Sequence, residues 1–294
     1  MGSLKPNFLM GLFYCLSFIS ATPVAAEDKM KIVASFSILA DMVQQVVGEY
    51  AIVTTIVGPN SDAHVYQPSI ADARSVAEAD IIFVNGLGFE TWSDTLIANS
   101  GTKGSLHVAT DGIIPVLVDD EVDPHAWNSL LNGITYIENI SAVLKQKIPE
   151  HEAEFTKNAT AYTKQLRALD VKARTALAKL GPDKRTIVTS HDAFGYLADA
   201  YGMNFLAPLG IDSEAEPSAQ ELTKLIDQIK TDGVAALFAE NITSPTLVKQ
   251  IANETGLEIG GRLFSDALSD SSGPAASYLA MFEHNLKTLF GALN

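Results

Sequence analysis

Four short segments place a histidine or an aspartate among turn-forming or aromatic neighbours, and these residues could do chemistry. They are centred on His64 in 59–68, His125 in 123–127, His191 in 189–194 and Asp266 in 264–268. Imidazole and carboxylate are the groups that zinc accepts when thiolates are absent, and three histidines with one carboxylate make a tetrahedral set. The first hypothesis is therefore one metal ion held between these segments.

Each residue taken singly also has a structural interpretation. A lone histidine in a loop is more often a polar surface residue than a ligand, and Asp266 fits an ordinary turn aspartate. Three further histidines illustrate this: His107 lies within a strand pattern, His151 at the start of a long helical run, and His284 among helical residues. We interpret these three as structural or solvated.

Strand and helix patterns alternate along the chain, which indicates parallel sheets at whose carboxyl ends ligands collect. The predicted strands are 31–36, 51–57, 81–84 and 106–108 in the first half, and 186–189, 203–206, 235–239 and 258–259 in the second. Helical patterns cover 38–47, 219–230 and 245–255. The fold class is thus α/β, with two parallel-sheet lobes, and the four segments should face the cleft between them.

One uninterrupted helical pattern, 149–180, separates the two halves. It contains no internal Gly or Pro, carries one apolar stripe, begins with Pro149 and is followed by Gly181-Pro182. We expect one rigid helix that joins an N-terminal lobe over 27–148 to a C-terminal lobe over 181–294.

The beginning of the chain has the pattern of a secretory signal peptide over 1–26. Lys5 precedes an apolar run over 8–19, and small residues come before Glu27. The only cysteine, Cys15, lies inside the apolar run, so it does not look like a lipid attachment site, and the mature chain has no thiol for a disulfide or a metal. We expect a periplasmic protein.

Composition limits the partners. The chain has 294 residues and a formal net charge of −15. It should not bind nucleic acid, because a protein needs basic patches for that. Its length suits two domains of ordinary size. We expect a monomer.

The motifs and their order resemble the solute-binding proteins of bacterial ABC importers for zinc and manganese. The motifs are DAHVYQPSIADA, ADIIFVNGLGFETW, DPHAW, SHDAFGYLADAYGM and SDALSDSSGPAASYL. The resemblance implies that His64, His125, His191 and Asp266 bind the metal, two from each lobe, and that a membrane permease of the importer receives it. Histidine rather than glutamate at the third ligand, His191, looks like the zinc type.

One departure from many zinc-type relatives is the short segment 111–123, which contains no histidine where they carry a histidine-rich loop. This absence suggests another loading route, such as a metallochaperone that delivers zinc. A metal-bound imidazole normally donates its second nitrogen to a carboxylate or carbonyl, and Asp62, Asp123 and Glu240 are the candidates.

Other functions stay open at this stage. The first alternative is a manganese or dual manganese and zinc solute-binding protein. A secreted zinc hydrolase would use three histidines with a bound water, but the sequence has neither a His-Glu-x-x-His nor a Gly-x-Ser-x-Gly motif. An adhesin would need no internal metal, so the metal content of the purified protein separates these classes.

Overall fold

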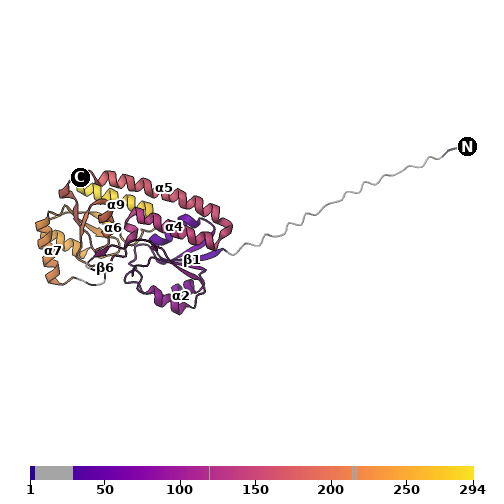
Figure 1. Cartoon of the computed structure of the whole chain (residues 1–294), viewed down its shortest axis with the longest axis horizontal. Coiled ribbons are helices and arrows are strands. Elements are labelled where there is room, and N and C mark those ends of the chain that lie inside the picture. Colours follow the sequence, from indigo (N-terminus) through magenta and orange to yellow (C-terminus); the bar gives the residue numbers. More distant parts are fainter. Residues whose placement is uncertain (4–28, 119, 214, 216) are drawn as a thin grey trace.

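The computed structural model describes residues 1–3, 29–118, 120–213, 215 and 217–294 (Figure 1). The predicted signal peptide, with Lys5 and Cys15, lies outside the described residues apart from its first three positions. No helix in the described ranges is both long enough and apolar enough to span a membrane.

The N-terminal lobe contains a four-stranded parallel sheet with the order β2-β1-β3-β4. Its strands are β1 (Met30–Phe36), β2 (Ala51–Val57), β3 (Ile81–Val84) and β4 (Ser105–Val108). Its helices are α1 (Ser37–Val47), α2 (Ile70–Ala77), α3 (Ser93–Ser100) and α4 (Leu130–Lys147). Figure 1 shows α2 on one side of the sheet and α4 on the other. Strand β3 is buried along its whole length, as expected for a strand covered on both faces.

The C-terminal lobe repeats this architecture with a parallel sheet in the order β10-β9-β7-β8. Its strands are β7 (Thr186–Val188), β8 (Asn204–Leu206), β9 (Ala236–Glu240) and β10 (Ile259–Leu263). Its helices are α6 (Gly195–Tyr201), α7 (Ala219–Asp232), α8 (Thr246–Thr255) and α9 (Tyr278–Leu293). The eight predicted strands are therefore present, with shifts of a few residues at their ends.

One long helix, α5 (Glu152–Leu177), lies along both lobes beside α9 (Figure 1). Its 26 residues correspond to about 39 Å at 1.5 Å per residue. It packs on α1 and α4 of the first lobe and on α6 and α9 of the second. Its buried stripe includes Phe155, Tyr162, Leu166, Leu169, Ala173 and Leu177. The predicted linking helix is confirmed.

Both ends of this helix differ from the prediction. Pro149 begins a short 3-10 turn, Pro149–His151, and the α-helix starts only at Glu152. The helix ends at Leu177, three residues early, and the guanidinium of Arg185 donates to the carbonyls of Leu177 and Leu180 at this end. Those bonds help to satisfy the carbonyls at the end of the helix, whose cap is Ala178 rather than Gly181.

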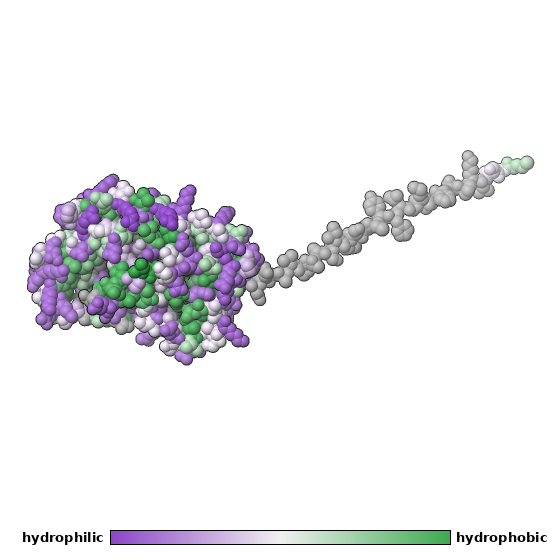
Figure 2. Space-filling view, viewed as in Figure 1, coloured by the Kyte–Doolittle hydropathy of each residue, from purple (hydrophilic) through white to green (hydrophobic). Residues whose placement is uncertain are grey.

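A small antiparallel hairpin, β5 (Leu117–Val118) and β6 (Glu121–Val122), lies within the short segment 111–123 that has no histidine-rich loop. Leu117 and Val122 are exposed. The space-filling view shows hydrophobic residues near the middle of this face, where Figure 1 labels β6 (Figure 2).

Candidate metal centre

His64 lies in the loop between β2 and α2. Its backbone N–H donates to Asp62 Oδ1 at 2.9 Å, which closes a tight turn around Ala63. The loop ends at Ser69, which caps α2 in a reciprocal pair with Asp72. The other oxygen of Asp62, Oδ2, accepts a hydrogen bond from Ser213 Oγ of the opposite lobe at 2.7 Å. Asp62 thus positions the backbone of His64 rather than its ring.

His125 follows β6 and precedes a 3-10 turn, Ala126–Asn128. Asp123 Oδ1 accepts from the backbone N–H of His125 at 2.9 Å and lies 2.8 Å from the ring Nδ1. One carboxylate oxygen therefore fixes both the backbone and the ring, and it directs Nε2 away from Asp123. Glycine is needed at 195, because a Cβ there would lie 2.5 Å from Asp123 Oδ2.

His191 and Asp266 follow the carboxyl ends of β7 and β10, where a parallel sheet collects ligands. Glu240, the last residue of β9, holds His191 from behind. Its Oε2 lies 2.5 Å from His191 Nδ1, and its Oε1 accepts from the backbone N–H groups of Ser190 and His191 at 2.7 and 3.0 Å. The ring orientation of His191 is therefore set by a buried carboxylate, as for His125.

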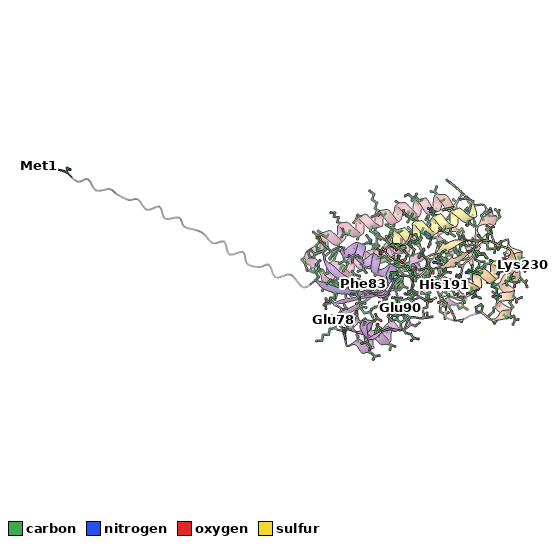
Figure 3. All side chains as sticks on the ribbon, turned by 180° about the vertical axis from the view of Figure 1, so that it is seen from behind. Met1, Glu78, Phe83, Glu90, His191 and Lys230 are labelled. Carbon is green, nitrogen blue, oxygen red and sulfur yellow. The ribbon has the colours of Figure 1, made fainter. Side chains whose placement is uncertain are left out.

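The four predicted ligands come together at the middle of the molecule, where Figure 3 labels His191 between the two lobes. One ligand atom from each of the four lies within 4.8 Å of all the others. His64 Nε2 is 3.1 Å from His125 Nε2. Asp266 Oδ2 lies 3.0, 3.4 and 3.6 Å from the Nε2 atoms of His191, His64 and His125. Tetrahedral bonds of about 2.0–2.1 Å separate neighbouring ligand atoms by about 3.3–3.4 Å, so these spacings suit one ion.

Buried hydrogen bonds hold the His125 segment against the C-terminal lobe. Trp127 Nε1 donates to the carbonyl of Ser265 at 2.8 Å, beside Asp266. Asn128 Nδ2 donates to the carbonyl of Ala193 at 2.9 Å, two residues after His191. The hydroxyl of Tyr196 donates to the carbonyl of Asp123 at 2.9 Å. Trp127 is fully buried, and its indole N–H also links the segments that carry His125 and Asp266.

The histidines and carboxylates of the cluster shift one another's pKa values. Burial alone would lower the pKa of His125, but Asp266 and Asp123 outweigh it and raise that pKa to about 9. Burial also opposes the charged form of His191, yet Glu240 and Asp266 raise its pKa well above the usual value. Burial would raise the pKa of Asp266, but His191 and His125 hold it well below the ordinary range. A cation at this position would replace the protons that the imidazoles hold.

A further buried carboxylate, Glu90, was missed by the sequence analysis; Figure 3 labels it in the N-terminal lobe. It accepts hydrogen bonds from Ser35 Oγ at 2.5 Å and from the backbone N–H of Asn85 at 2.7 Å. Burial raises its pKa. Asn85 Nδ2 in turn donates to the carbonyl of Pro124 at 2.9 Å, directly before His125. Asn85 and Glu90 lie in the motif ADIIFVNGLGFETW, but only the fold brings them to their distant partners, Pro124 and Ser35.

The remaining histidines lie outside the cluster, in the roles that the sequence suggested. His107 Nε2 lies 2.9 Å from Ser105 Oγ, and His284 Nε2 lies 3.1 Å from the carbonyl of Arg262. His151 packs on the ring of Tyr50 with 4.0 Å between centroids.

Two of the three carboxylates predicted to orient a ring do so, namely Asp123 and Glu240. The prediction for Asp62 is wrong, because its two oxygens are used by the backbone of His64 and by Ser213.

Several known metal-binding proteins are similar to this chain. The iron-binding protein YfeA of Yersinia pestis is 33% identical over 272 residues, which cover 91% of this chain and 87% of YfeA. The manganese ABC transporter substrate-binding lipoprotein PsaA of Streptococcus pneumoniae is 31% identical over 297 residues, covering 97% of this chain and 95% of PsaA. The solved structure of the periplasmic zinc-binding protein TroA of Treponema pallidum superposes with a TM-score of 0.86 at 28% identity, covering 90% of this chain and 99% of TroA.

A family model, "zinc-uptake complex component A, periplasmic", matches residues 32–292. Members of this family are substrate-binding proteins that work with ABC transporters, which excludes the hydrolase alternative. The metals in the names of these relatives differ: iron for YfeA, manganese for PsaA and zinc for TroA. The chain belongs to the ZnuA family of periplasmic metal-binding proteins.

Proposed function

We propose that this protein captures one zinc ion between its lobes with His64, His125, His191 and Asp266 and delivers it to an ABC importer. The observation that carries the proposal is the convergence of three Nε2 atoms and one carboxylate oxygen, with four of their six separations between 3.0 and 3.6 Å. Nitrogen-rich tetrahedral sites suit zinc, whereas manganese prefers more oxygen ligands and stands lowest in the affinity order.

Manganese or iron is the competing cargo, and one observation favours it. Asp266 Oδ1 is buried and has no hydrogen-bond partner among the described residues. If both oxygens of Asp266 turned to the ion, the site would become five-coordinate, which suits manganese better than a four-coordinate shell. The names of YfeA and PsaA, for iron and manganese, support the same alternative.

Metal analysis of the purified protein tests the proposal. After chelator treatment and reloading with an equimolar metal mixture, we expect one equivalent of zinc and little manganese. His191→Glu should lower zinc affinity and narrow the zinc-to-manganese ratio, because a carboxylate supplies up to two oxygens at this position. Equal retention of both metals by the wild type, or an unchanged ratio in His191→Glu, would identify a dual-metal binder instead.

The cellular setting is part of the proposal. We infer a periplasmic monomer released from a signal peptide over 1–26, with lobes over 27–148 and 181–294 around the linking helix. Its partners are the importer permease and, because the segment 111–123 has no histidine-rich loop, a metallochaperone that loads it. PsaA is named a lipoprotein, so anchoring by a lipid is the competing arrangement.

Mass spectrometry of the exported protein separates these arrangements. A free chain that begins at Glu27 supports the signal peptide. A lipid-modified amino terminus would contradict it.

A further inference from the structure

The four ligand side chains differ in their access to the space between the lobes. A cavity of about 540 Å³ is lined by residues of both lobes, including Glu121, Val122 and Ile211. His64 is the one ligand in its wall. The side chains of His125, His191 and Asp266 are 0% exposed, whereas that of His64 is 5% exposed. An ion that enters from this cavity therefore meets His64 first.

A hydrogen-bonded carboxylate ties the His64 segment to the opposite lobe beside the same cavity. Asp62 Oδ1 holds the backbone N–H of His64 at 2.9 Å, and Asp62 Oδ2 accepts from Ser213 Oγ at 2.7 Å. Ser213 directly follows Ile211 and Asp212, which line the cavity. Ser213 has φ of 55°, a left-handed conformation that a serine adopts only when its surroundings hold it. We call Asp62 and Ser213 the clasp.

The clasp differs from the other bonds that join the lobes at the site. The bonds made by Trp127, Asn128 and Tyr196 are buried. The clasp is only partly buried. A second bond of the same loop, from the backbone N–H of Asn60 to the carbonyl of Leu268 at 2.9 Å, lies further from His64 in sequence. The clasp can therefore open without disturbing the buried contacts, and its opening frees the backbone that carries His64.

We propose that the clasp sets the rate at which the metal enters and leaves, because it holds His64 over the bound ion. This inference rests on the proposed metal-binding function. Asp62 and Ser213 act as positioning residues through His64 and do not bind the metal. A hydrogen bond to a charged group is worth enough to change a rate about tenfold, so loss of the clasp should accelerate release by about that factor.

Stopped-flow release of zinc into an excess of a coloured chelator tests the proposal. Ser213→Ala removes only the clasp and should speed release about tenfold. Asp62→Ala should speed it more, because His64 also loses its backbone partner. Asp62→Asn should have the mildest effect, since an amide can still accept from His64 N–H and bond Ser213. In the Asp62→Ala background, Ser213→Ala should add nothing.

Ser272→Ala is the matched control. Ser272 Oγ donates to Asp270 Oδ1 at the same 2.7 Å, but both residues belong to one exposed loop of the C-terminal lobe. It should release zinc at the wild-type rate, and every variant should keep one equivalent of zinc and its melting temperature within a few degrees.

Three results would overturn the proposed role of the clasp. They are a wild-type release rate in Ser213→Ala, equal acceleration in Ser272→Ala, and additive effects of Asp62→Ala and Ser213→Ala. A wild-type protein that holds no zinc would instead overturn the proposed function.

Discussion

The N-terminal lobe supplies two metal-ligand candidates in the same three-residue pattern, Asp-x-His, and uses the aspartate differently in each. In Asp123-Pro124-His125 one carboxylate oxygen holds both the backbone and the ring of the histidine. In Asp62-Ala63-His64 the first oxygen holds only the backbone, and the second reaches Ser213 of the other lobe. The first histidine is fully buried, and the second lines a cavity.

This difference suggests that the two histidines have different roles within one site. His125 is fixed by buried groups of both lobes, so it can define where the ion sits. His64 is fixed through a partly buried bond next to the cavity, so it can control exchange. A transport protein must bind tightly and also release its cargo, and two differently supported ligands satisfy both requirements.

The largest expected effect is the loss of a ligand. His125→Ala, His64→Ala and His191→Ala should each weaken zinc binding by more than 100-fold, beyond the roughly 10–100-fold that loss of an orienting partner costs. Isothermal titration measures this. His107→Ala and His284→Ala are the controls and should bind like the wild type. A loss in His107→Ala equal to that in His64→Ala would show that the site is misassigned.

The next effect separates the two aspartates. Asp123→Ala should lower equilibrium zinc affinity about 10–100-fold, because His125 loses the partner of its ring. Asp62→Ala should act mainly on rates, with a smaller loss of affinity, because the ring of His64 has no described carboxylate behind it. Titration together with release kinetics measures both quantities. Equal losses of zinc affinity in the two variants would show that Asp62 and Asp123 have the same role.

The contrast between Asp62 and Asp123 also shows which features could be predicted from the sequence. The alternation of strands and helices predicted both lobes and the linking helix, and the four candidate ligands were chosen because a metal site needs their side-chain types. The role of Asp62 was predicted wrongly, because the pattern around it matches that around Asp123. What separates them is Ser213, which is far away in sequence and carries no motif. The role of Glu90 was missed because its partner Ser35 is also distant in sequence.

The two aspartates should also differ in their effect on the pH dependence of metal binding. The carboxylates of Asp266 and Asp123 raise the pKa of His125 to about 9, so at neutral pH a proton competes with the metal for this ring. Apparent affinity should therefore rise with pH up to about 9, by about tenfold per unit for each proton displaced. Asp123→Asn should shift this rise to lower pH, whereas Asp62→Asn should keep the wild-type profile. Competition titrations between pH 6 and 9 measure it, and a flat profile would contradict the coupling.

The smallest expected effect is on overall shape. Because α5 packs against both lobes, metal loading should move loops rather than rotate the lobes about a hinge. Small-angle scattering should give nearly equal radii of gyration for metal-free and zinc-loaded protein. A change of several ångströms would mean that the helix does not act as a rigid spacer.

The central claim is that one metal ion lies among the four converging side chains. A crystal of zinc-loaded protein, with anomalous diffraction recorded on both sides of the zinc absorption edge, tests it most directly. We predict a single strong peak about 2.0–2.1 Å from the Nε2 atoms of His64, His125 and His191 and about 2.0–2.2 Å from a carboxylate oxygen of Asp266. A peak elsewhere, or one that lacks any of these four ligands, would contradict the account.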